Sequence, residues 1–155
     1  MRLILKLLVA SIAMNMVAGI LATSAKAGTQ KDCDETRERQ ALQQPEPKNW
    51  VGLYRLFKQF GQCDDGAIGE GFSEDVAQLL SKQWAHLDAL SRLTIADKTF
   101  ERFVLGHVDA TLSDDELKVI ANNSTLHCPT SEKRLCQLLR TRAQSALDEL
   151  RKYSK

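Results

Sequence analysis

The sequence predicts an all-α protein, a compact single-domain bundle of five to six uneven helices stapled by two disulfides. Apolar residues recur at spacings of three and four from residue 50 onward, and no run of alternating β-branched residues predicts a strand. The chain also has four cysteines, and an even number in an exported domain favours disulfide bonds.

Residues 1–27 have the pattern of a cleaved secretory signal peptide. Arg2 and Lys6 give a positive start, residues 7–21 are mostly apolar, and Ala25-Lys26-Ala27 supplies the small-x-small cleavage site. The alternative is a retained membrane anchor, but the apolar run is shorter than the about 20 residues that span a bilayer. We therefore expect an exported protein, periplasmic or secreted, without stable membrane anchoring after cleavage.

The charge of the mature chain limits its partners. Of the 21 basic and 20 acidic residues, three basic ones lie in residues 1–27, which leaves 18 basic and 20 acidic side chains in the mature 128 residues. A net charge near −2 provides no broad positive field, so we expect no nucleic-acid partner. The mature length is typical of one domain with a modest core.

The mature chain divides into a polar N-terminal arm, residues 28–48, and a helical domain, residues 49–155. The arm has no helical periodicity, and its two prolines make its end extended. Of three possible disulfide pairings, we favour Cys128–Cys136, which closes a short turn, and by elimination Cys33–Cys63, which ties the arm to the domain. On the chain-entropy model these bonds contribute at most about 2.5 and 3.5 kcal/mol.

The helical domain opens with two apolar stripes. The first extends from Trp50 to Phe60, and Gly61 is predicted to end its helix. The second extends over residues 68–87, either as one helix or as two with a break at Ser73. Residues 87–95 then look like a helix end and a short connection. A further helix is expected over residues 97–108, with one apolar face made by Phe100, Phe103, Val104 and His107.

The strongest local signal lies at residues 112–117. Ser113 and Glu116 form an S-x-x-E capping box, and Leu112 and Leu117 stand at the positions of a hydrophobic staple. The helix that starts here is predicted to end near Asn122-Asn123. The last helix is predicted to start at a cap formed by Thr130 or Ser131, after Pro129.

The stretch CDDGAIGEGF, residues 63–72, concentrates acidic residues and glycines. A calcium loop needs acids at alternate positions, whereas Asp64 and Asp65 are adjacent, and a phosphate-binding loop needs a Lys-Ser/Thr pair that is absent here. We interpret the stretch as a helix start with Asp64 and Asp65 at its N-terminus. Its three glycines indicate either the close approach of another helix backbone or a surface left bare for a partner.

No constellation of catalytic residues emerges from the spacing. His86, His107 and His127 are scattered, and the zinc set that His127 would form with Cys128 and Cys136 competes with disulfide formation. His107 is expected to be a packed, hydrogen-bonded core residue. No G-x-S-x-G motif occurs, so we predict no catalytic residue, metal or cofactor. Paired carboxylates distant in sequence leave an unrecognised hydrolase as a minor alternative.

In length, export signal, helical content and cysteine count, the chain resembles small periplasmic immunity proteins, which neutralise toxins delivered by rival bacteria. No motif matches residue by residue, so the resemblance assigns no site residue. It implies a protein-binding inhibitor rather than an enzyme. From the residues, Asp64, Asp65 and Glu70 are the candidate contacts for a basic partner. The alternative function is a helical carrier that encloses a small apolar ligand among its aromatic side chains.

Overall fold

The structure, a computed structural model, describes residues 33–153 and is all-α over that range. The predicted signal peptide lies outside the described residues. The helices are α1 (Glu35–Leu42), α2 (Trp50–Phe60), α3 (Gly66–Lys82), α4 (Leu87–Ala96), α5 (Lys98–Gly106), α6 (Asp114–Leu126) and α7 (Lys133–Tyr153). Short 3₁₀ turns occupy Gly61–Cys63, Trp84–His86 and Thr130–Glu132. The all-α class is confirmed, with more helices than the five to six predicted.

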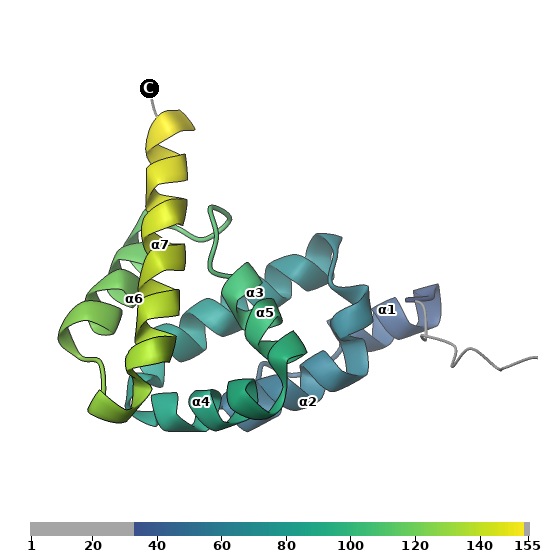
Figure 1. Ribbon diagram of the computed structural model, residues 1–155. Coiled ribbons are helices and arrows are strands. Elements are labelled where there is room, and N and C mark those ends of the chain that lie inside the picture. The colour runs from purple at the N-terminus through teal and green to yellow at the C-terminus, as the bar shows by residue number, and fades with distance from the viewer. Residues whose placement is uncertain (1–32, 154–155) are drawn as a thin grey trace, which may run out of the picture.

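The helices are arranged around α3, which links the two ends of the molecule (Figure 1). α6 and α7 form an antiparallel hairpin at one end, where α6 also contacts α3. α2, α4 and α5 pack in succession along the body, and α1 contacts α2 and α3 at the opposite end. The last turns of α7 project beyond the other helices (Figure 1).

Aromatic rings from three helices meet in the core beside the N-terminal half of α3. The ring centroids of Phe57 and Phe103 are 4.7 Å apart, and those of Phe72 and Phe103 are 5.0 Å apart. Phe100 packs against Phe57 with ring centroids 5.2 Å apart, and both Phe100 and Trp50 have at most 1% of their surface exposed. Burial of each such ring stabilises the fold by about 1.5–3 kcal/mol. The apolar stripes predicted for α2, α3 and α5 thus meet in this core.

An ion pair ties α5 to α7. Arg134 donates two hydrogen bonds to the Glu101 carboxylate, at 2.6 and 2.7 Å, and Glu101 is buried. These hydrogen bonds hold the pKa of Glu101 below its usual range, against the opposing effect of burial. Lys98 adds a further hydrogen bond to the same carboxylate at 3.2 Å.

Both predicted disulfides are present. Cys33–Cys63 joins Cα atoms 5.0 Å apart, and Cys128–Cys136 joins Cα atoms 6.0 Å apart. The first bond fixes Cys33, two residues before the start of α1, to the 3₁₀ turn between α2 and α3. Consequently, part of the predicted polar arm is packed onto the domain.

Two helices were missed by the periodicity argument. α1 lies within the polar arm and buries no residue, so no apolar stripe marks it, although the Asp34 carboxylate caps it by accepting from the Arg37 N–H at 2.8 Å. α4 replaces the predicted connection after Leu87. Its buried face includes Ser91 and Thr94, whose polarity hides the helical spacing that they share with Leu87 and Leu90.

The ends of the last two helices also differ from prediction. α6 continues to Leu126, one turn beyond the predicted end, and the hydroxyls of Ser124 and Thr125 bond to carbonyl oxygens within it. α7 begins at Lys133, and residues 130–132 form a 3₁₀ turn before it, so neither Thr130 nor Ser131 directly precedes this helix. The predicted capping box of α6 is confirmed.

Candidate functional site

The start of α3 carries the acidic residues that the sequence singled out. Asp65 is the N-cap, and its carboxylate accepts from the N–H of Gly66 at 2.8 Å. Gly66 has a φ of +50°, a left-handed conformation that favours glycine. Cys63, just before these residues, is buried and disulfide-bonded to Cys33, which holds the acidic stretch against the body of the protein. One continuous helix follows, without the alternative break at Ser73.

The glycines of α3 are not explained by close helix packing, so that prediction was wrong. A Cβ added at Gly71 would meet no atom within 4 Å, and neither would one at Gly66. At Gly69 it would lie 3.2 Å from Oδ1 of Asp64, so this glycine makes room for the carboxylate. Gly66 and Gly71 therefore leave part of the surface of α3 bare, and the partner contact of the second interpretation stays a prediction.

His107, at the end of α5, joins Asp64 to Ser73 of α3. Its Nε2 lies 3.1 Å from Oδ2 of Asp64, and its Nδ1 lies 2.9 Å from Oγ of Ser73. Because an ionised carboxylate only accepts, Nε2 carries a proton and donates it to Asp64, while Nδ1 and the Ser73 hydroxyl share the second hydrogen bond. The predicted packed, hydrogen-bonded His107 is confirmed.

These three residues have the composition of a hydrolytic triad, but their surroundings differ from one. Ser73 is only 9% exposed and lies within α3, where its Oγ is also 3.1 Å from the carbonyl oxygen of Gly69. Backbone N–H groups in the interior of a helix are already bonded, so none beside Ser73 is free to stabilise an oxyanion. We interpret the hydrogen bonds from Asp64 through His107 to Ser73 as a structural link that holds the end of α5 against α3, here called the polar lock.

An open concave surface, here called the acidic hollow, lies beside these hydrogen bonds. It is bounded by the start of α3, the end of α5 and the loop that follows α5. Its volume is about 480 Å³. Four carboxylates line it and Arg102 is the one arginine or lysine among its lining residues, so its field is negative. The structure thus brings the three predicted contacts together and adds a fourth acid. The carboxylates belong to Asp64, Asp65, Glu70 and Asp109.

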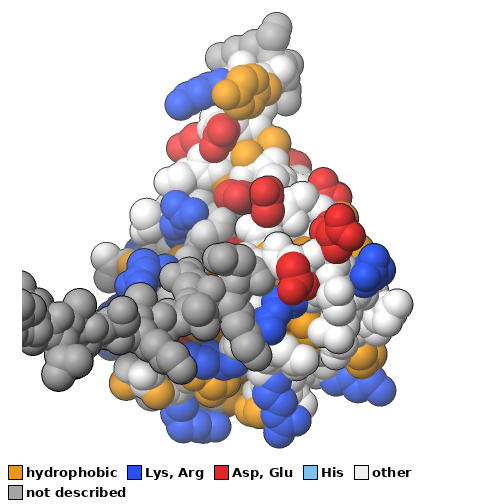
Figure 2. Space-filling model, turned by 90° about the vertical axis from the view of Figure 1, so that its right-hand side faces the viewer, with side chains coloured by type: hydrophobic (Ala, Val, Ile, Leu, Met, Phe, Trp, Pro, Cys, Tyr) orange, Lys and Arg blue, Asp and Glu red, His pale blue; other side chains and the backbone are white. Residues whose placement is uncertain are grey.

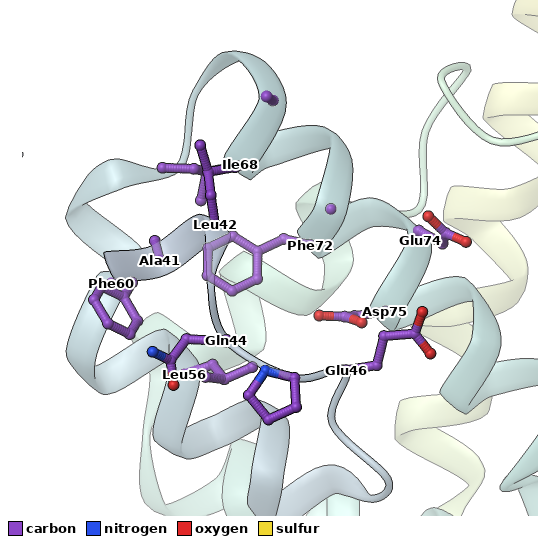
Figure 3. A pocket seen from close by; sticks show the side chains of 13 residues that line it. Ala41, Leu42, Gln44, Glu46, Leu56, Phe60, Ile68, Phe72, Glu74 and Asp75 are labelled. Carbon is purple, nitrogen blue, oxygen red and sulfur yellow. The ribbon is translucent and has the colours of Figure 1, made fainter. Parts of the chain in front are cut away.

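A second concave site, here called the α1–α3 pocket, lies on the other flank of α3 (Figure 3). It encloses about 170 Å³ between α1, α2 and α3. Its walls are mainly apolar, and carboxylates of α3 and of the segment after α1 lie at one side (Figure 3). The apolar walls include Leu42, Leu56, Phe60, Ile68 and Phe72.

The carboxylates at the α1–α3 pocket are Glu46, Glu74 and Asp75. Burial, together with the nearby charges of Glu46 and Glu74, raises the pKa of Asp75 to about 7. No arginine or lysine lies among the residues that line the pocket. The pocket was not predicted from the sequence, because α1, which forms one of its walls, had not been predicted. The acidic pair Glu74-Asp75 was the one visible signal.

An exposed ridge of α3 separates the acidic hollow from the α1–α3 pocket. It consists of Gly66, Ala67, Glu70, Gly71 and Glu74, which are all exposed and recur at helical spacing. Three of the five have no side chain beyond Cβ, so another molecule can approach the backbone closely here. Figure 2, which views the α1 end of the molecule, shows acidic side chains gathered over the upper half of this face, with lysine and arginine side chains along its lower edge and also at its sides.

The described residues offer no cluster of three potential metal ligands. The zinc set considered from the sequence cannot form, because Cys128 and Cys136 are bonded to each other. No helix within residues 33–153 combines the length and apolar character needed to cross a membrane.

The fold and its sites define a class, an all-α protein with two disulfides and an acidic surface on one helix. Comparison with protein-family models, curated protein sequences and solved structures finds no match for this chain.

Proposed function

We propose that this is an exported protein that binds a basic protein partner, as an inhibitor or immunity protein does, through the acidic hollow. The observation that carries the proposal is the grouping of Asp64, Asp65, Glu70 and Asp109 around one open concavity. Like charges placed together on a surface repel each other, so a partner with lysine or arginine at its contact surface relieves that repulsion on binding.

The geometry supports a protein partner over a small ion. The hollow is wide, and its acids are spread over α3, the turn before it and the loop after α5. Asp64 is fixed by His107 and Asp109 by Thr111, whose N–H lies 2.9 Å from the Asp109 carboxylate. Carboxylates held in place in this way present a preorganised surface, which lowers the entropy lost on binding.

Export is part of the proposal and is supported by the two disulfides, which form and persist in oxidising compartments. The alternative function, a carrier of a small apolar ligand, has support from the apolar walls of the α1–α3 pocket. However, that pocket holds about 170 Å³, whereas pockets for small-molecule ligands usually enclose about 300–1,000 Å³. Its size is better matched to a single side chain.

The experiment is affinity capture followed by charge reversal. The oxidised protein, processed as cells export it, is immobilised and exposed to proteins from its source and from close competitors, and bound proteins are identified by mass spectrometry. We expect a basic partner whose affinity falls about tenfold in the double variant Asp65→Lys/Glu70→Lys and falls with rising salt. Asp64 is left intact because it holds His107.

A matched control makes the same change of net charge elsewhere. Asp115 and Glu149 are exposed on α6 and α7, so Asp115→Lys/Glu149→Lys should leave the affinity within about twofold. Equal losses in the two double variants would show a response to net charge alone and would contradict a contact at the hollow. A captured partner without a basic surface would contradict it as well.

A further inference from the structure

We infer that the α1–α3 pocket receives one lysine or arginine side chain of the basic partner, with the aliphatic stem against Ile68 and Phe72 and the cationic end beside Glu46 and Asp75. This inference rests on the proposed function and extends it to a second contact. The acidic hollow then binds the partner on one flank of the α3 ridge, and the pocket binds it on the other.

The shape and the lining of the pocket favour such an occupant. About 170 Å³ bounded by Leu56, Ile68 and Phe72 accommodates a chain of a few methylene groups or a single ring. A purely apolar group would fill the walls and leave the carboxylates at the side of the pocket without a counter-charge. A side chain with an apolar stem and a cationic end satisfies both parts of the site.

The charges at the pocket point to the same chemistry. Glu46 makes no ion pair among residues 33–153, and Glu74 accepts a hydrogen bond only from the neutral amide of Gln78, at 3.2 Å. Asp75 is half-buried beside both, and burial with these two charges raises its pKa to about 7. A cation placed here stabilises the ionised form of Asp75, so its binding releases a proton near neutral pH.

The α3 ridge allows the partner to reach the pocket. Ala67 and Gly71 line the pocket and are also exposed, and a Cβ at Gly71 would meet nothing within 4 Å. The partner backbone can therefore lie close to α3 while one of its side chains enters. The same bare position offers a test, because a larger residue at 71 has room to occupy the pocket without a clash at its Cβ.

The first test needs no partner. n-Butylguanidinium, which mimics an arginine side chain, is titrated into the ¹⁵N-labelled oxidised protein and followed by NMR. We expect saturable shifts at the amides of Ile68 and Gly71, with binding about fivefold tighter than that of n-butanol and stronger at pH 8 than at pH 6. The variant Glu46→Gln/Asp75→Asn should lose this preference for the cation.

The second test blocks the pocket. Gly71→Leu should abolish the shifts, while the matched variant Gly71→Ala, which adds only one methyl group to an exposed helical position, should keep them. Equal binding of n-butanol, unchanged binding in the carboxylate variant, or no saturable shift would overturn the inference. A captured partner that loses affinity in Asp65→Lys/Glu70→Lys but not in Gly71→Leu would also overturn it, while the proposed function would stand.

The proposed function can also fail while the preference of the pocket for a cation is found. If n-butylguanidinium binds selectively but no basic protein is captured, the proposed function fails, whereas the preference of the pocket for a cationic chain stands.

Discussion

The two ends of the described chain are held in place by different means. α1 buries no residue fully and is fixed by the Cys33–Cys63 bond, with the Arg37 side chain donating to the carbonyl oxygen of Gln59 at 3.3 Å. The α6–α7 hairpin instead buries apolar side chains from both helices, among them Leu117 and Leu139, which are fully buried. Covalent and polar contacts thus dominate at one end, and apolar burial dominates at the other.

The difference matters because both candidate sites lie toward the α1 end. α1 supplies Ala41 and Leu42 to the wall of the α1–α3 pocket, and the acidic hollow depends on the lock between Asp64 and His107. Surfaces that bind partners often belong to the less stable parts of a fold. The comparison therefore predicts that changes near α1 affect the sites more than changes in the hairpin do.

The largest expected effect comes from removing the disulfide that holds α1. Cys33→Ser/Cys63→Ser should lower the free energy of unfolding by up to about 3.5 kcal/mol. An eight-residue helix is too short to be stable alone, so amide hydrogen exchange over residues 35–42 should become fast. Denaturant unfolding and hydrogen exchange measure the two effects.

The matched control removes the other disulfide. Cys128→Ser/Cys136→Ser should cost at most about 2.5 kcal/mol, and the amides of α6 and α7 should keep their protection, because apolar contacts hold the hairpin. If the α1 amides stayed protected from hydrogen exchange in Cys33→Ser/Cys63→Ser, α1 would not need its covalent link. That result would contradict the view that the disulfide holds this end of the molecule.

Removal of the His107 ring is expected to have the next largest effect. His107→Ala leaves Asp64 and Ser73 without their shared partner and opens a cavity beside Phe103, whose ring centroid is 4.5 Å from that of His107. We expect a loss of about 2–3 kcal/mol in the free energy of unfolding. His86→Ala is the control, because His86 is exposed, and it should change stability by less than about 0.5 kcal/mol. Similar losses in both variants would contradict a lock at His107.

Much of the fold was predictable because the buried faces of α2, α3 and α5 consist of large apolar residues. Trp50, Phe72 and Phe103 mark their helices by spacing alone, and all three are buried. α4 was not predicted because Ser91 and Thr94 lie on its buried face. α1 was not predicted because its helix depends on a cap and a disulfide. Periodicity detects helices that pack through apolar residues and misses those held by other means.

The candidate site was predictable only where its residues are close in sequence. Asp64, Asp65 and Glu70 lie within seven positions, so their shared surface follows from one helix start. Asp109 reaches the acidic hollow from the loop after α5, and Glu46 reaches the α1–α3 pocket from the segment after α1. Such meetings depend on tertiary packing, and so does the burial that raises the pKa of Asp75.

A smaller effect on the free energy of unfolding is expected from replacing Asp75. The replacement should stabilise the protein at pH 8, whereas replacement of Glu101 should destabilise it. The folded-state pKa of Asp75 is about 7, above its ordinary value of 3.8, so folding favours its protonated form and stability falls as pH rises from 3.8 to about 7. Asp75→Asn removes the cost of ionisation. With solvent exposure taken into account, it should raise the free energy of unfolding by about 1–2 kcal/mol at pH 8, and the gain should vanish near pH 4.

Glu101, which ties α5 to the start of α7, provides the contrast. Arg134 lowers the pKa of Glu101, so its contribution to stability is present above its ordinary pKa and is lost as pH falls through the lowered value. Glu101→Gln should therefore destabilise the protein at pH 8. Urea unfolding at pH 4 and pH 8 measures both variants, and a loss of stability at pH 8 in Asp75→Asn would contradict the unfavourable environment of this carboxyl group.

The smallest expected effect separates a cap that forms from one that does not. Ser113 caps α6, with its Oγ 3.3 Å from the N–H of Glu116, so Ser113→Ala should cost about 1 kcal/mol. Ser131 lies in the 3₁₀ turn before α7, where no side-chain cap forms, so Ser131→Ala should cost less than about 0.5 kcal/mol. Chemical denaturation distinguishes these values. Equal losses would mean that Ser131 caps α7 in solution, and the start of α7 predicted from the sequence would then be correct.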